Sequence, residues 1–282
     1  MDASGTESTV LKEYTQQSHT QQTAVGHGYA LSVQGARHLH DHVPCQDHSL
    51  YKIDGDTVFI GVADGHGDAK HALSHIGSRL ALEIAYPILK EALETLTIPH
   101  THREWLSIQN NIERRVRWEW NCACKRELGL PDSDGSWIPE LIQFGTTLLA
   151  CCQSSKGLLC FQIGDGDIAW MSQDGSVHYI FPESEDVIGT VTHSLCRPFE
   201  EGVCQSCLLP PPINCSMILL STDGIRDCLQ GERDRFATIL PWLSKRKDDP
   251  ITQIAQWLYQ ISSSGNGDDM SVAIHYPSSD HL

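Results

Sequence analysis

The sequence has few positive charges and no long apolar run. It carries 20 Lys and Arg residues against 36 Asp and Glu residues, which gives a formal net charge of −16. Nucleic-acid backbones and anionic membranes repel such a chain. No apolar run approaches the roughly 18 residues of a membrane-spanning helix, and the first residues lack the basic and apolar regions of a secretory signal. We therefore expect a cytoplasmic protein with no nucleic-acid and no membrane partner.

Cysteine, in contrast, is abundant, with 11 residues. Because the number is odd and no export signal is expected, we predict reduced, mostly buried thiols rather than a disulfide framework. Cys204 and Cys207 lie on a segment predicted to be extended, where residues three apart point to opposite faces. They are therefore not expected to bind one zinc ion together with Cys196 and Cys215.

The sequence predicts a tail followed by one domain. Residues 1–24 are rich in Ser, Thr and Gln and predict a flexible N-terminal tail, whereas residues 25–282 predict one α/β domain. Strands are predicted at 29–33, 51–53, 57–63, 145–150, 158–163, 168–172, 176–180, 217–220 and 271–276. Helices are predicted from periodic apolar residues at 73–88, 105–120 and 251–261, and a histidine-rich loop at 35–47.

The second predicted helix and its continuation carry a group of basic residues. They are Arg114, Arg115, Arg117, Lys125 and Arg126. Glutamates are interleaved with them, and the chain as a whole is strongly negative. This pattern favours a solvated helix face over a nucleic-acid-binding patch.

Aspartates stand where predicted strands end or begin. They are Asp47, Asp64, Asp165, Asp223 and Asp268. Any single Asp-Gly pair can simply form a turn, but the same arrangement recurs several times along this chain. Carboxylates on rigid supports, beside glycines that let backbone carbonyls approach closely, suit a hard divalent cation such as Mg²⁺ or Mn²⁺.

Six motifs occur along the chain in a consistent order. They are GARHLHDHVPCQD (35–47), GVADGHGD (61–68), FGTTLLA (144–150), IGDGDIAW (163–170), LLSTDGIRD (219–227) and GNGDDMSV (265–272). With them the chain resembles the metal-dependent protein phosphatase 2C (PPM) superfamily, especially its bacterial branch, from about Val25 to Tyr276. The resemblance implies an α/β (α+β) fold, a four-layer αββα sandwich of two central antiparallel β-sheets flanked by helices.

The resemblance also implies a metal site in a cleft at one end of the sandwich. Asp64 matches the aspartate that bridges two divalent ions, and Gly65 matches the residue whose backbone carbonyl binds one of them. Further metal ligands are matched by Asp47, Asp223 and Asp268. Asp165 matches the aspartate that holds a third, weaker metal. The implied cofactors are therefore two Mn²⁺ or Mg²⁺ ions, with a place for a third.

Other site residues follow from the same resemblance. His66 matches the histidine suggested as general acid, and either Arg37 or His38 occupies the phosphate-binding position. The chain departs from the family pattern at Gln46, where better-known members have an acidic residue. It departs again at Asp269, where an Asn is more usual.

The implied activity is that of a metal-dependent protein-serine/threonine phosphatase, a phosphoric monoester hydrolase. It would hydrolyse phosphoserine or phosphothreonine in substrates of a cognate Ser/Thr kinase by direct attack of a metal-bridging water. The alternative is a pseudophosphatase, a regulatory module that binds phosphoproteins without turnover, which Gln46 keeps open. The acidic exterior favours basic stretches around the phosphosite.

Overall fold

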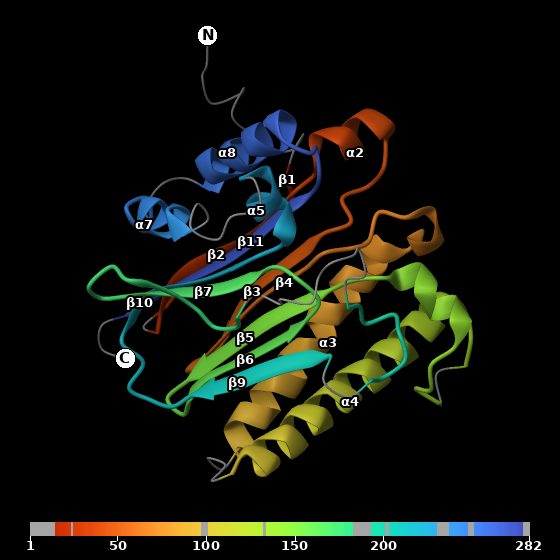
Figure 1. Ribbon diagram of the computed structural model, residues 1–282, viewed down its shortest axis with the longest axis horizontal. Helices are drawn as coiled ribbons and strands as arrows, with labels where there is room; N and C mark the ends of the chain where they lie inside the picture. The colour runs from red at the N-terminus through yellow and green to blue at the C-terminus, as the bar shows by residue number, and fades with distance from the viewer. Residues whose placement is uncertain are drawn as a thin grey trace.

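Two antiparallel β-sheets pack face to face, and helices cover the outer face of each sheet (Figure 1). The computed structural model describes residues 15–23, 25–96, 101–131, 134–182, 193–200, 203–229, 237–247 and 251–278. The predicted four-layer αββα sandwich is confirmed. Among the helices in these ranges, none combines the length and the apolar character needed to cross a lipid bilayer.

The strands form one six-stranded and one five-stranded sheet within the described ranges. The first sheet has the order β1 (Thr15–Thr23), β2 (Gly26–Val33), β11 (Met270–Pro277), β10 (Cys215–Ser221), β7 (Asp167–Ser172) and β8 (Val177–Tyr179). The second has the order β3 (His48–Asp54), β4 (Thr57–Ala63), β5 (Leu148–Ser154), β6 (Gly157–Ile163) and β9 (Cys204–Leu209). Every strand predicted from an apolar run is present, with boundaries that differ by a few residues.

The helices divide between the two outer faces (Figure 1). They are α2 (Ala36–Asp41), α3 (Ser74–Thr95), α4 (His102–Glu127), α5 (Asp223–Cys228), α7 (Ile239–Ser244) and α8 (Ile251–Ser264), with short 3₁₀ turns η1 (Ala69–His71) and η2 (Pro139–Phe144). Helices α3 and α4 share an apolar core with the five-stranded sheet, and α7 and α8 share another with the six-stranded sheet. A third core fills the space between the sheets.

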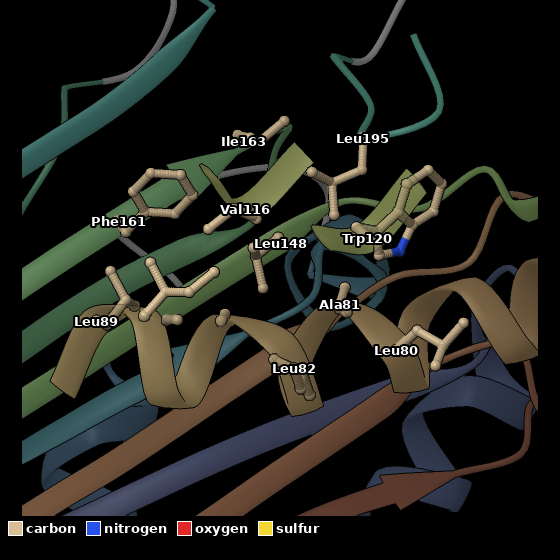
Figure 2. Packing of buried hydrophobic residues seen from close by; sticks show 14 of the residues in the cluster. Leu80, Ala81, Leu82, Leu89, Val116, Trp120, Leu148, Phe161, Ile163 and Leu195 are labelled. Carbon is tan, nitrogen blue, oxygen red and sulfur yellow. The ribbon is translucent and has the colours of Figure 1, made fainter. Parts of the chain in front are cut away.

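The α3–α4 layer is held by apolar packing and by one buried hydrogen bond. Figure 2 shows Leu89 of α3 and Trp120 of α4 in this core together with Leu148 and Phe161 of the sheet. The Trp120 indole Nε1 donates to the backbone carbonyl of Gly77, at 3.0 Å. Since both groups are buried, this bond fixes how the two helices meet.

Helix α4 does not present a wholly solvated basic face, contrary to the prediction. Arg115 is exposed, but Arg117 is only 4% exposed and donates from Nε to Oε1 of the fully buried Glu113, at 2.8 Å. Arg117 Nη1 also donates to the backbone carbonyls of Ser194 (3.2 Å), Leu195 (3.1 Å) and Arg197 (3.0 Å). A buried charge needs such partners, and these come from a segment 77 to 80 residues further along the chain.

The sheet begins earlier than predicted, because part of the expected tail forms the edge strand β1. It pairs antiparallel with β2, from Thr15 opposite Val33 to Thr23 opposite Gly26. Backbone pairing needs no apolar pattern, which is why a segment rich in Gln, Ser and Thr gave no strand signal. Residues 1–14 and 24 lie outside the described residues. The predicted loop at 35–47 also contains a helix, α2.

The cysteines are free thiols, eight of them buried and three partly buried. Cys204 packs in the core beside α3 and α4, whereas Cys207 packs against the core between the sheets. The two side chains therefore point to opposite faces of β9, as the strand alternation predicts.

Candidate functional site

A cavity of about 860 Å³ lies where β4 and β10 end and where β7 and β11 begin. Most of the site residues proposed from the sequence line it. They are Arg37, His38, Asp64, Gly65, His66, Asp165, Asp223 and Asp268. They come together because the ends of neighbouring strands meet at one edge of each sheet. Asp47 is the exception among the proposed residues.

The cavity holds a cluster of carboxyl groups that influence one another. Asp64, after β4, is fixed through its backbone: its N–H donates to Thr147 Oγ1 at 2.9 Å, and its carbonyl accepts from the Thr147 N–H at 2.8 Å. Burial, and then the charge of Asp223, raise the pKa of Asp64 well above its usual range. Burial and the charge of Asp165 raise the pKa of Asp223 to about 7. Carboxyl groups this close need protons or a cation to offset their repulsion.

Asp47 lies buried behind this cluster and does not line the cavity. Its Oδ2 accepts a hydrogen bond from Thr222 Oγ1 at 2.9 Å, and Thr222 Oγ1 in turn accepts one from the Ser271 N–H at 3.0 Å. Burial and the charge of Asp269 raise the pKa of Asp47 well above its usual range. Asp47 therefore supports the residue that precedes Asp223.

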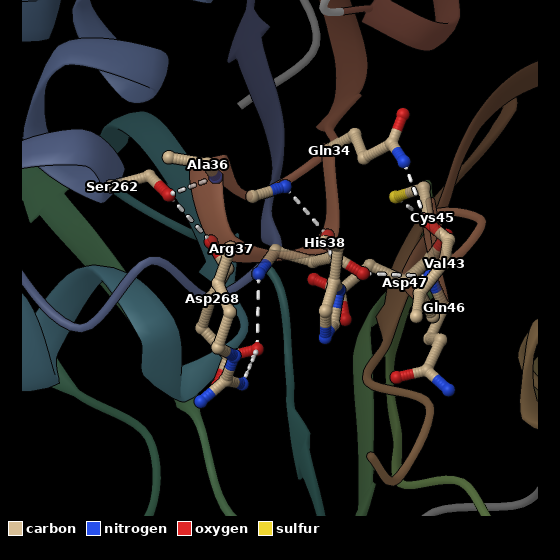
Figure 3. Close-up of polar contacts among 12 residues, drawn as sticks. Gln34, Ala36, Arg37, His38, Val43, Cys45, Gln46, Asp47, Ser262 and Asp268 are labelled. Carbon is tan, nitrogen blue, oxygen red and sulfur yellow. Dashed lines mark hydrogen bonds and ion pairs between the residues drawn. The ribbon is translucent and has the colours of Figure 1, made fainter. Parts of the chain in front are cut away.

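Asp269 joins three parts of the chain below the cavity rim. Its two carboxylate oxygens accept backbone hydrogen bonds from Gly35 (2.6 Å) and Gln46 (2.7 Å), and Oδ1 lies 2.9 Å from His38 Nδ1. His38 is consequently buried against Asp269, whereas Arg37 is exposed and its Nη2 lies 3.4 Å from Asp268 Oδ1 (Figure 3). Of the two candidates for the phosphate-binding position, Arg37 is the one whose charge stays accessible.

The contact with Asp269 predicts the titration of His38. The hydrogen bond to Asp269 raises the pKa of His38 above its usual range. The stabilisation is therefore present below about pH 6.5 and is lost as the pH rises through the higher folded-state pKa. We expect Asp269→Asn to lower the His38 pKa and to cost about 1–3 kcal/mol of unfolding free energy. The carboxamide can accept from only one of the two backbone N–H groups without turning its NH₂ toward the other.

NMR titration of His38 and chemical denaturation measure both effects. Asp41→Asn is the matched control, because it removes the partner of the exposed His40, at 2.8 Å, without touching Asp269. A His38 pKa that does not move in Asp269→Asn would contradict this role of Asp269.

The oxygen atoms around the cavity fit a hard divalent cation. Besides the carboxylates, the buried Gln46 Oε1 has no hydrogen-bond partner among the described residues. It lies 3.7 Å from the position that a Cβ on Gly67 would take, close to the cavity wall. Gly65 packs so tightly that a Cβ would lie 2.3 Å from the Gln46 carbonyl oxygen, so this position requires glycine. Carboxylate, amide and carbonyl oxygens are the ligands of Mg²⁺ and Mn²⁺.

These ligands do not form a finished cage in the structure. In the described ranges, no group of three or more acidic, histidine or cysteine side chains is arranged to hold a metal ion. The oxygen donors nevertheless have the chemistry that a divalent ion needs. The carboxylates repel one another, and a cation between them would neutralise that repulsion.

Two histidines continue the cavity beyond the carboxylates. The rings of His66 and His71 have centroids 4.9 Å apart, and His71 Nδ1 contacts the carbonyl oxygen of Ile142. Burial, and then the charges of His71 and Arg197, lower the pKa of His66 to about 4. His66 is therefore a neutral imidazole at pH 7, able to donate one hydrogen bond.

Several lining residues were not identified from the sequence. They are Lys70, His71, Trp137, Ile142, Arg197 and Pro198. Lys70 and His71 directly follow the GVADGHGD motif, so the position of that motif could have signalled them. Arg197 belongs to no motif and reaches the cavity only because α4 holds its segment in place.

Comparison with known proteins finds a related sequence family. The sequence profile described as "Protein phosphatase 2C" matches residues 34–259. No curated protein matches the chain in sequence.

Similar solved structures share the fold at low sequence identity. They include RsbX in complex with magnesium (15% identity, 93% of this chain and 100% of that chain, TM-score 0.52). A sex-determining protein of C. elegans is also similar (16% identity, 91% of this chain and 66% of that chain, TM-score 0.59). The serine-threonine phosphatase 2C of Toxoplasma gondii is similar as well (10% identity, 93% of this chain and 99% of that chain, TM-score 0.57).

Proposed function

The chain belongs to the protein phosphatase 2C family, and from this membership we propose that it is a metal-dependent protein serine/threonine phosphatase. The observation that carries the proposal is the single cavity lined by Asp64, Asp165, Asp223 and Asp268, with Arg37 and His66 on the same walls. These groups combine the ligands for divalent cations with donors for a phosphate.

The cation ligands are the carboxylates of Asp64, Asp223 and Asp268 and the carbonyl of Gly65, with the Gln46 amide oxygen close by. Asp165 lines the same cavity, its charge acts on Asp223, and it would supply a ligand for a third ion. When bound, such cations activate a water molecule for in-line attack on phosphorus and neutralise charge on the phosphate oxygens. Asp47 acts behind them by holding Thr222 through its hydroxyl.

Arg37 and His66 serve the substrate in this proposal. Arg37 sits at the rim beside Asp268 and can turn its guanidinium to phosphate oxygens, for which its fork of donors is suited. His66 is neutral in the free protein, so it first acts as a hydrogen-bond donor to the leaving oxygen. A bound phosphate dianion near the ring would raise its pKa, so that the ring can take up a proton from solvent and deliver it to that oxygen.

Turnover of p-nitrophenyl phosphate and of a phosphoserine peptide, with and without Mn²⁺ or Mg²⁺, tests the proposal. Hydrolysis that depends on the cation is the expected result. Cation binding, measured by calorimetry, without turnover of either substrate would favour the pseudophosphatase instead.

Cation binding should depend on pH in a defined direction. Burial raises the pKa of Asp64, and the pKa of Asp223 is raised to about 7, so as the pH falls a cation must displace protons from these carboxyl groups. We expect Mn²⁺ to bind about tenfold or more tightly at pH 8 than at pH 5.5, with proton release at the lower pH. Isothermal titration calorimetry in buffers of different ionisation enthalpy measures both quantities. Equal affinities at the two pH values would place the cation elsewhere.

A further inference from the structure

The cavity has a second part, which no metal ligand occupies. It is formed by Lys70, His71, Trp137, Ile142, Arg197 and Pro198, and we call it the flanking subsite. It adjoins the carboxylate part through His66, whose ring neighbours that of His71. A substrate that places its phosphate at the carboxylates therefore places a neighbouring group here.

The wall that carries Arg197 is rigidly built although Arg197 itself is exposed. Arg117, buried in α4, donates to the carbonyls of Ser194, Leu195 and Arg197. Trp137 Nε1 donates to the Cys196 carbonyl at 2.7 Å, and the Leu195 N–H donates to the Thr146 carbonyl at 3.0 Å. The backbone that leads up to Arg197 is thereby fixed, which lowers the entropic cost of using its side chain for recognition.

The charge of Arg197 is available to a ligand. Of the other cations at the cavity, Arg37 pairs with Asp268 at 3.4 Å and Lys70 pairs with Asp68 at 3.0 Å. Arg197 forms no ion pair within the described part of the chain, and its charge acts on His66 and His71. In a protein of net charge −16, this guanidinium is a local positive site beside the carboxylate cluster. A guanidinium binds a carboxylate through paired hydrogen bonds.

We propose that the flanking subsite binds an acidic side chain next to the phosphorylated residue, with Arg197 as the specificity-determining residue. The proposal rests on the phosphatase activity proposed above and names its substrate class, acidic phosphopeptides. Trp137 and Ile142 supply apolar walls of the same cavity. The local geometry thus opposes the basic flanks that the overall charge favours.

Two phosphoserine peptides of equal length test the subsite, one with Asp on both sides of the phosphoserine and one with Lys at the same positions. With Mn²⁺, we expect kcat/KM for the acidic peptide to be about tenfold higher than for the basic one. Arg197→Gln should remove this preference, and its loss on the acidic peptide should exceed its loss on p-nitrophenyl phosphate by about fivefold or more. The matched control Arg103→Gln removes an exposed arginine of α4 outside the cavity and should keep the preference.

Equal losses on both peptides and on the aryl phosphate would overturn the proposal, because Arg197 would then serve the phosphate itself. A wild-type preference for the basic peptide would overturn it as well. If no substrate is turned over, the proposed phosphatase activity fails but the subsite is still tested by fluorescence anisotropy. Tighter binding of the acidic peptide, lost in Arg197→Gln, supports the subsite, and equal binding of the two peptides rejects it.

Discussion

Asp64→Asn should lower the cation-dependent hydrolysis of p-nitrophenyl phosphate by about 10³-fold or more. Asp64 lines the cavity, and the charges of Asp223, Asp47 and Asp268 all act on it. An amide at this position keeps the shape but removes the anionic ligand. The measurement is kcat/KM at saturating Mn²⁺ for the variant and the wild type.

The loss of activity in Asp64→Asn should not result from a loss of folding stability. The ionised Asp64 is costly in the folded state, because a carboxyl with a raised folded-state pKa loses stability as the pH rises from about 4 through that pKa. At pH 8 without metal, Asp64→Asn should therefore unfold at a temperature no lower than the wild type. Asp56→Asn, which removes an exposed carboxylate just before β4 begins, is the matched control and should keep full activity. A loss of less than about tenfold in Asp64→Asn would exclude Asp64 as a metal ligand in the reaction.

The sequence alone predicts the positions of the carboxylate cluster well, because those positions follow from local rules. Asp64 and Asp223 each follow an apolar strand, and Asp268 precedes one, so sheet formation itself brings them to one edge. The same applies to the individual strands and the three long helices, whose apolar runs and periods match strand or helix geometry. The arrangement of the strands in two sheets followed from the family resemblance instead.

The burial of a polar side chain and its long-range contacts cannot be predicted from such local patterns. Asp47 stands in a motif beside the site, yet its burial depends on Thr222 and Asp269, which are far along the chain. Arg117 reads as one of several solvated basic residues of a helix, and only the segment that folds over α4 makes it a buried anchor. Some residues, Arg197 among them, are held in place by partners that are distant in the sequence. Their roles can be identified only from the structure.

Arg117→Met should destabilise the protein by about 3–5 kcal/mol. The substitution leaves Glu113, which is 0% exposed, without its ionic partner and removes the shared donor of three backbone carbonyls. Burial already raises the pKa of Glu113, and without Arg117 it rises further. The variant should therefore lose less stability at pH 5 than at pH 8, because a carboxyl whose folded-state pKa is raised destabilises the protein as the pH rises through that pKa. Chemical denaturation at the two pH values measures the difference.

Two further variants separate the charge from the packing. Arg115→Met removes an exposed arginine of α4, which pairs with Glu91 of α3 and Glu119 of α4, and should cost no more than about 1 kcal/mol. The double variant Glu113→Leu/Arg117→Met removes both buried charges and should recover part of the stability, but not the carbonyl contacts. Its segment 193–198 should remain loosened, so hydrogen exchange at Leu195 should be faster than in the wild type. If Arg117→Met costs no more than Arg115→Met, the buried pair does not anchor this wall of the cavity.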